Sequence, residues 1–411
     1  MSAPDLSHRS TAAGVKFRRK GDASAADAPH LLRIMLVLHG AHSQGSGILG
    51  FLSTADVVPL RAACKELRDG VGDFPWASMN RFPGSLRLWR ASFPRAIAVN
   101  VEERHDLVDA DFIHLCGIRR LKMKGCRQAG ITDAAFAHLR GIHTLNMSWC
   151  NQKAITDAAF AHLGGIHTLD MSFCQQAGIT DAAFVHLRGI HTLDMGGCRQ
   201  EGITDAAFAH LRGIHTLRMS WCNQNSITDA AFAHMRGIHT LDMSHCKQEG
   251  ITDAAFAHLR GIHTLNMSFC RQEGITDAAF AHLSGIHTLY MSYCAGITDA
   301  AFSRLSGIHT LHMTGCTQDG ITDAAFTHLR GIQKLYMSCC SQAGITDAAF
   351  AHLSGIQALH MSFCNQAGIT GAGLIAHLRG IRYLDIDGCT RPGVLAARRA
   401  LVETGVRARL R

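Results

Sequence analysis

The feature that most constrains this chain is a 24-residue phrase that recurs along most of its length. The letters Ile-Thr-Asp-Ala-Ala-Phe occur ten times between Ile131 and Phe350. A degenerate copy begins at Val108 and another at Ile369, which makes twelve copies. Periodicity of this kind is typical of arrays in which each unit packs against its neighbours. The sequence therefore predicts a repeat array from about residue 105 to residue 390.

Each unit combines a helix signal with a strand signal. Thr132 is a good helix N-cap, and Asp133 places a carboxylate in the first turn, where it complements the helix dipole. Gly141 suits a left-handed C-cap. Leu145 and Met147 then alternate with polar residues, which predicts a short strand with both side chains buried.

The unit has an apolar edge that it cannot bury alone. In one copy this edge consists of Ile131, Phe136, Leu139, Ile142, Leu145, Met147 and Cys150. Stacking of neighbouring copies supplies the missing core. We expect an α/β solenoid, a curved horseshoe with parallel strands on its concave face and short helices on its convex face. At about 4.8 Å per strand, twelve copies give an arc of about 55 Å, enough for a folded protein partner.

The repeat also resembles a known family. The spacing L-x-x-L-x-L-x-x-C is the leucine-rich-repeat pattern, and Leu145 to Cys150 carries it as Leu-Asn-Met-Ser-Trp-Cys. Ending on Cys and followed by Ile-Thr-Asp, this phrase resembles the cysteine-containing repeats of F-box/leucine-rich-repeat proteins. Those proteins are substrate receptors of SCF-type ubiquitin ligases. The resemblance implies a substrate-recognition subunit with an SCF adaptor and cullin complex as partners.

Four regions are predicted. They are a disordered arm over 1–29, an F-box-like helical domain over 30–92, the repeat array over 93–390, and a C-terminal capping helix over 391–411.

The segment ahead of the array resembles an F-box. It has an apolar helix end, a helix that begins after an Asp, and a closing Trp. The resemblance implies that the adaptor docks on Ile48, Leu49, Phe51, Leu52, Val57, Leu60, Arg61 and Trp76. The alternative is a plain helical cap that shields the first repeat.

The copies differ from one another at only a few positions, and two of these predict a binding face. One position lies between the two buried strand residues and must point to the concave side; the other precedes the Cys. A mixed polar and aromatic face suits protein recognition. The predicted target-binding residues are Asn146, Trp149, Asp170, Asp194, Arg218, Trp221, Asp242, Asn266, Tyr290, His312, Tyr336 and His360. The alternative is drift at solvent positions after duplication, and the aromatic residues before Cys could instead be half-buried against neighbouring loops.

Two histidines recur in the unit, one on the helix and one at the start of the strand, as His138 and His143 illustrate. Stacked copies place the strand histidines about 5 Å apart. We expect solvated or structural side chains rather than a metal site, because an endless ladder lacks closed ligand geometry. Joint protonation should weaken the array, so stability is expected to be lower at pH 5.5 than at pH 7.5.

Cysteine usage and composition exclude several classes of function. Twelve of the 15 cysteines form a periodic series, which indicates buried thiols in a reducing compartment, cytoplasm or nucleus, rather than a disulfide framework. No apolar run is long enough to span a membrane. The formal net charge of +8 is partly terminal, and no nucleic-acid-binding signature accompanies it.

No phosphate-binding loop, nucleophile elbow or zinc-protease helix is present, so no enzyme activity, cofactor or metal is expected. The favoured interpretation is a monomeric SCF substrate receptor for an unknown target protein. The alternative is a stand-alone leucine-rich-repeat scaffold or inhibitor without a ligase link.

Overall fold

The computed structural model describes residues 73–77, 80–403 and 405–408. These residues divide between two compact units, one holding 73–76 with 93–95 and the other holding the remainder. In the smaller unit, the ring of Trp76 packs edge-to-face on Phe74 and Phe93, with centroids 4.7 and 5.8 Å away. The larger unit contains the repeats.

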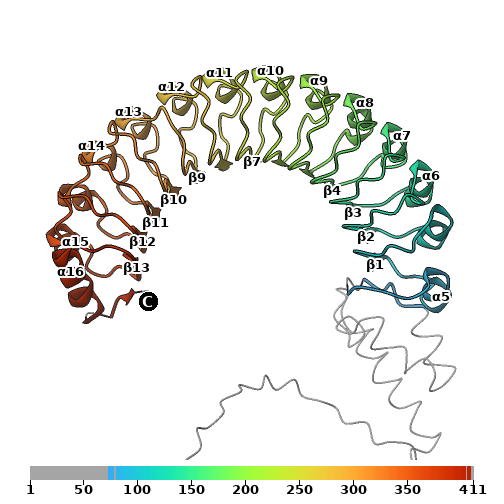
Figure 1. Ribbon diagram of the computed structural model, residues 1–411, viewed down its shortest axis with the longest axis horizontal. Helices are drawn as coiled ribbons and strands as arrows, with labels where there is room; N and C mark the ends of the chain where they lie inside the picture. The colour runs from blue at the N-terminus through green and yellow to red at the C-terminus, as the bar shows by residue number, and fades with distance from the viewer. Residues whose placement is uncertain (1–72, 78–79, 404, 409–411) are drawn as a thin grey trace, which may run out of the picture. The chain divides into compact units, whose positions relative to one another are not determined.

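In the residues that the structure describes, the larger unit is built on one parallel sheet of 14 strands, and the strands follow one another in chain order. They line the inner side of the repeat array, and the helices lie on its outer side (Figure 1). The strands are β1 (Ala98–Asn100), β2 (Arg120–Lys122), β3 (Thr144–Asn146), β4 (Thr168–Asp170), β5 (Thr192–Asp194), β6 (Thr216–Arg218), β7 (Thr240–Asp242), β8 (Thr264–Asn266), β9 (Thr288–Tyr290), β10 (Thr310–His312), β11 (Lys334–Tyr336), β12 (Ala358–His360), β13 (Tyr383–Asp385) and β14 (Arg407–Ala408).

Helical turns follow each strand from β1 to β13, and α5 precedes β1. The helices are α5 (Leu86–Ser92), η1 (Asp109–Leu115), α6 (Asp133–Phe136) with η2 (Ala137–Leu139), α7 (Asp157–Phe160), α8 (Asp181–Phe184) with η3 (Val185–Leu187), α9 (Asp205–Phe208), α10 (Asp229–Phe232), α11 (Asp253–Phe256), α12 (Asp277–Phe280), α13 (Asp299–Phe302), α14 (Asp323–Phe326), η4 (Asp347–His352), α15 (Ala372–His377) and α16 (Pro392–Glu403). Across the described part of the chain, none of these is long and apolar enough to cross a membrane.

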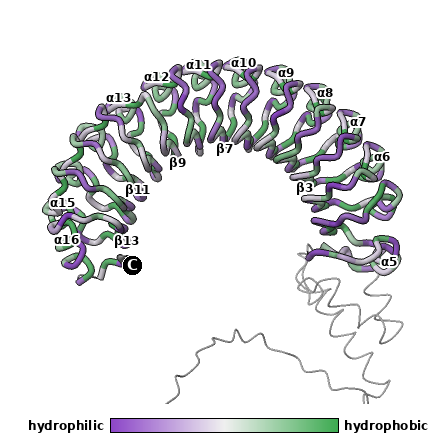
Figure 2. The backbone as a smooth tube through the Cα atoms, in the orientation of Figure 1, coloured by the Kyte–Doolittle hydropathy of each residue, from purple (hydrophilic) through white to green (hydrophobic). Residues whose placement is uncertain are grey.

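The predicted leucine-rich-repeat solenoid is confirmed, and the predicted apolar edge is its core. In the copy that begins at Ile131, all seven predicted core side chains are at most 2% exposed. The same positions are buried in the following copies, so hydrophobic residues recur from turn to turn of the backbone (Figure 2). Burial of one large ring per repeat, such as Phe136, contributes on the order of 2–3 kcal/mol per copy.

The helix start joins each repeat to the one before it. Thr156 caps α7 by accepting a hydrogen bond from the Ala158 amide at 3.3 Å, as the sequence predicts. The Asp133 carboxylate of the preceding repeat accepts two more, from the Thr156 amide and hydroxyl, both at 2.7 Å. The same pair recurs from Asp109 with Thr132 to Asp347 with Thr370. The Asp therefore complements the dipole of its own helix and also binds the helix start of the next repeat.

The turn after each strand is held by buried polar side chains. The Cys150 thiol donates to the Met123 carbonyl at 3.1 Å, and the Gln152 amide donates to the Cys126 carbonyl at 2.7 Å. Both bonds reach back to the preceding repeat. The thiol gives the Met123 carbonyl a second partner beside the Cys126 amide, and the glutamine amide binds the Cys126 carbonyl. The sequence predicts buried thiols at these positions, but it led to no prediction for the glutamine, which recurs two residues after most of the cysteines.

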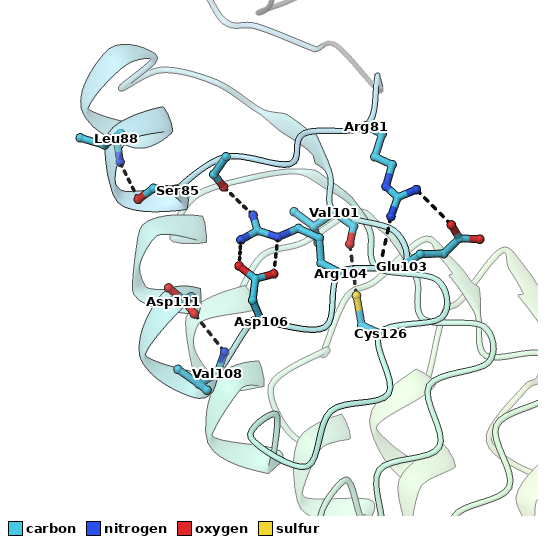
Figure 3. A network of polar contacts seen from close by, with 11 residues as sticks. Arg81, Ser85, Leu88, Val101, Glu103, Arg104, Asp106, Val108, Asp111 and Cys126 are labelled. Atoms are coloured by element: carbon cyan, nitrogen blue, oxygen red, sulfur yellow. Dashed lines mark hydrogen bonds and ion pairs between the residues drawn. The ribbon is translucent and has the colours of Figure 1, made fainter.

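The array has irregular strands at both ends, beyond the twelve copies recognised in the sequence. At the first turn, Arg104 is 7% exposed; it pairs with Asp106 through two hydrogen bonds and donates to the Gly84 carbonyl at 2.6 Å (Figure 3). At the other end, α16 packs on α15, and β14 pairs with β13. These elements cover the core of the outermost repeats in the described residues.

Candidate functional site

The inner face of the sheet carries the strand-middle residues that vary between copies. We call ten of them the inner-face column: Asn146, Asp170, Asp194, Arg218, Asp242, Asn266, Tyr290, His312, Tyr336 and His360. Each is paired in parallel register with the next, so they form one row across ten strands. Arg218 is exposed and the other nine are half-buried. The structure therefore brings these predicted residues together on one surface.

The first part of the inner-face column is polar, and its aspartates outnumber its single arginine. The Asp194 and Asp242 carboxylates each accept a hydrogen bond from the amide two residues ahead, at 3.0 and 2.9 Å. The Asn146 amide donates to Asp170 at 2.8 Å. Burial and the neighbouring Asp170 raise the pKa of the Asp194 carboxyl, whereas the hydrogen bond from the Gly196 amide lowers it; the net direction is upward. These contacts hold the carboxylates in fixed positions toward the inner face.

The second part of the inner-face column is a stack of aromatic rings. Tyr290, His312, Tyr336 and His360 lie ring on ring, with successive centroids 4.2, 3.9 and 4.2 Å apart. Half-burial lowers the pKa of His312 to about 4, with a smaller contribution from His360, so this ring is neutral at pH 7. At the end of the stack, His360 Nδ1 lies 3.5 Å from an Asp385 carboxylate oxygen. The stack offers a rigid aromatic surface beside the acidic one.

A second row lies at the edge of the inner face, at the residue before each cysteine. We call it the edge column; its members include Trp149, Phe173, Trp221, His245, Phe269 and Tyr293. All have positive φ, between 56° and 62°, which is uncommon for bulky residues. Trp149 stacks on Phe173 at 4.3 Å, and Trp221 begins a second stack through His245, Phe269 and Tyr293.

The left-handed backbone of the edge column was not predicted. Its signal was present, because the same position is Gly125, Gly197, Gly315 and Gly388 in other copies. Gly197 and Gly315 also end the two stacks, which run from Trp149 to Phe173 and from Trp221 to Tyr293. A Cβ placed on Gly197 would lie 2.6 Å from the Phe173 ring, because each ring leans over the following repeat. Trp149 and Trp221 are 37% and 39% exposed, so the predicted target-binding indoles are open to solvent.

The strand histidines form a third row, His143, His167, His191, His215, His239, His263, His287 and His309. Their rings stack with centroids 4.5–4.6 Å apart. Desolvation, then neighbouring histidines, lower the pKa of His167 and His215. Because these pKa values are lower in the folded chain than in the unfolded chain, protonation favours unfolding, in agreement with the expected loss of stability in acid. In the part of the chain that the structure describes, no group of three potential ligands is arranged to hold a metal.

The cysteine series does not form a reactive site. The twelve periodic thiols are buried, and burial raises the pKa of Cys174 and Cys222 to about 12. A thiol with such a pKa is neither a nucleophile nor a ready metal ligand at pH 7.

The predicted adaptor-binding residues from Ile48 to Arg61 lie outside the described residues. Trp76 is described and is 1% exposed. Its ring packs on Phe74 and Phe93 within its own unit. The docking role of Trp76 and of the other residues named for it stays a prediction.

Comparison with known proteins identifies the repeat. The sequence profile described as BspA type leucine rich repeat region matches residues 116–239 and 225–357, together more than half of the chain. No curated protein sequence matches the chain at a significant level.

Solved structures share the fold at low sequence identity. A leucine-rich-repeat protein of Leptospira interrogans matches with a TM-score of 0.60 and 10% identity, covering 83% of this chain and 97% of its own. An internalin of Listeria monocytogenes matches at 0.51 and 18%, covering 66% and 76%. A chain from the Toll–Spatzle complex of Drosophila matches at 0.51 and 13%, covering 76% of this chain; the match spans only 54% of the Drosophila chain. Identities this low establish the fold alone.

Proposed function

This chain belongs to the BspA type leucine rich repeat family, and from that premise we propose that it is a non-catalytic interaction scaffold whose inner face binds a target protein. The observation that carries this proposal is the inner-face column. Ten adjacent strands present side chains that vary from copy to copy, although the core beneath them hardly varies. Variation on a rigid support is what a recognition surface requires.

The chemistry of the inner-face column supports a protein partner rather than a small molecule. Acidic groups at Asp170, Asp194 and Asp242 lie in line with the aromatic stack that begins at Tyr290. Tyrosine is among the residues that dominate the binding energy of protein interfaces, and fixed charges add specificity. In the Toll–Spatzle complex a protein that shares this fold also binds a protein.

The test is to compare target capture by three forms of the full chain. A variant with Tyr290→Ala and Tyr336→Ala removes two rings from the stack. A control with Val185→Ala and Arg188→Ala changes two exposed residues on and beside η3, away from the strands. Loss of about 2 kcal/mol, or roughly thirtyfold in affinity, is expected for the first variant only. Equal capture by both variants, each shown by circular dichroism to be folded, would refute the proposal.

A finer version of the function is an SCF substrate receptor. It is supported by the F-box-like sequence ahead of the array and by the cysteine-ending repeats. In that version the segment around Leu52 and Leu60 binds the ligase adaptor, and the array holds the substrate close to the transfer machinery.

Co-precipitation with the SCF adaptor subunit tests this version separately. The full chain should bind the adaptor, and a chain with Leu52→Asp and Leu60→Asp should not. If the folded wild-type chain fails to bind, the ligase role is excluded and the scaffold function stands without it.

A further inference from the structure

Glycines interrupt the edge column at several positions, and the surroundings of Gly125 differ from those of the later glycines. Gly125 and Trp149 are successive members of this column, and Glu103, which precedes Arg104 instead of a cysteine, occupies the equivalent place one turn earlier; their φ values are 69°, 62° and 55°. At Gly197, Gly315 and Gly388 an aromatic ring from the preceding repeat covers the glycine. At Gly125 no ring does so, and the nearest atom to an added Cβ is Glu103 Cγ at 3.4 Å.

A cavity of about 580 Å³, wide open to solvent, lies at Gly125. Its volume lies within the range of ligand pockets in proteins. The wall on one side is the indole of Trp149, which is backed by Phe173 at 4.3 Å. Arg81 and Glu103, joined by the hydrogen bond that Figure 3 shows, also line the cavity. The cavity exists because Gly125 lacks the side chain that fills this position in other copies.

The lining of the cavity is positively charged. Arg81 is neutralised by Glu103, to which it donates at 3.0 Å, and it also donates to the Glu103 carbonyl at 3.1 Å. Two further cations remain. The Arg127 guanidinium lies over the Trp149 ring, 5.5 Å from its centroid, and Lys124 is exposed. Among the described residues, neither has a carboxylate within ion-pair distance.

We infer that this cavity binds a phosphorylated side chain of the target protein, an inference that rests on the proposed scaffold function. Two cations without counter-ions match a phosphate monoester, whose charge at pH 7 is about −1.5 to −2, better than a single carboxylate. Arg127 supplies a planar fork for the phosphate oxygens and Lys124 a point charge. The indole of Trp149 supplies an apolar wall for the stem that carries the phosphate. His105 lines the same cavity and adds a further donor.

The test is calorimetric titration of the full chain with phenyl phosphate, with inorganic phosphate and benzoate as comparison probes. Phenyl phosphate should bind most tightly, because it combines the dianion with an apolar stem. Equal binding of benzoate would overturn the preference for phosphate. Equal binding of inorganic phosphate would overturn the assignment to a side chain and indicate a site for the free ion.

Two variants locate the binding. Gly125→Phe should abolish it by filling the cavity, and it should fold because Phe173 and Phe269 adopt the same φ at the same position. Arg127→Ala should weaken it about tenfold or more. Arg199→Ala changes the exposed residue at the matching position three repeats later and should have no effect. Binding that survives both Gly125→Phe and Arg127→Ala, or is absent in wild type at millimolar probe, would overturn the inference.

These outcomes are separate from those for the scaffold function. If phenyl phosphate fails to bind while target capture still depends on Tyr290 and Tyr336, only the phosphate inference fails. If capture does not depend on the inner face while Gly125→Phe abolishes probe binding, the scaffold proposal fails. In that case the cavity is a phosphate-binding site, but its assignment to the target is overturned.

Discussion

Two adjacent glycines allow the energetic cost of ending a helix in this array to be measured. Gly164 and Gly165 are both exposed, and a Cβ added to either meets no atom within 4 Å. They differ in backbone conformation, because only Gly165 has a positive φ, +79°. The position of Gly164 is Arg140 in the preceding repeat, with a φ of −55° that any residue adopts. Replacement by alanine therefore changes one factor at a time.

The expected magnitudes follow from the two states of the chain. Alanine restricts the unfolded chain at either position and so stabilises the fold by about 0.4–1 kcal/mol. At Gly165 the left-handed conformation costs an L-residue about 1–2 kcal/mol. Gly164→Ala should therefore be slightly stabilising and Gly165→Ala destabilising. The unfolded-state contribution cancels between the two variants, so their difference of about 1–2 kcal/mol is the left-handed penalty itself.

Urea unfolding followed by far-ultraviolet circular dichroism provides the assay. The two variants and wild type are compared at one pH, and the difference in midpoint is converted to free energy with the common slope. The midpoint of Gly165→Ala should lie below wild type and that of Gly164→Ala at or above it. Coincident midpoints for the two variants would refute the argument that backbone conformation, and not side-chain space, selects glycine at this position.

Three further predictions concern the links between repeats, the aromatic stack and the thiols. Asp229→Ala removes two hydrogen bonds to the next repeat and should lower the free energy of unfolding by about 2 kcal/mol. Asp319→Ala, at an exposed turn, should change that free energy by less than about 0.5 kcal/mol. Similar changes for the two variants in urea unfolding would argue against the link. Because half-burial lowers the pKa of His312 to about 4 from an ordinary value of 6.5, its contribution is present above pH 6.5 and is lost as the pH falls toward 4. When the pH is lowered from 7.5 to 5.5, the free energy of unfolding of wild type should fall by up to about 1 kcal/mol more than that of His312→Gln, after allowance for solvent screening of a partly exposed ring. Equal falls in the two proteins, measured by urea unfolding, would exclude this contribution. Of the fourteen cysteines described, the exposed Cys116 and Cys339 should react with iodoacetamide in the native protein, and the buried ones only after unfolding. Peptide mass mapping identifies the labelled residues. Labelling of the buried thiols in the native protein would mean that the array opens readily.

Much of the fold follows from local rules that the repeated phrase displays. A Thr before Asp starts the helix, Gly141 ends it, and alternation at Leu145 and Met147 defines the strand, all as observed. The inner-face column could also be predicted, because a residue between two buried strand positions must point the other way.

The features that were missed depend on the relation between neighbouring repeats. The Asp133 carboxylate bonds to Thr156 only because stacking brings the next helix start beside it, which no single unit reveals. The left-handed edge column combines glycine with tryptophan, and the bulky residues concealed the backbone requirement. The end strands β1 and β14 lack the repeated phrase, so they depend on pairing with a neighbour rather than on a local signal.

The most direct test of the central proposal is site-specific photo-crosslinking from the inner face. The full chain is made with benzoylphenylalanine in place of Tyr336, on β11, or in place of Val185, an exposed residue of η3. The scaffold proposal predicts one discrete protein crosslinked from the Tyr336 position, absent from the Val185 position, and competed by excess wild-type chain. Crosslinks formed only from the Val185 position, or equally from both, would contradict it.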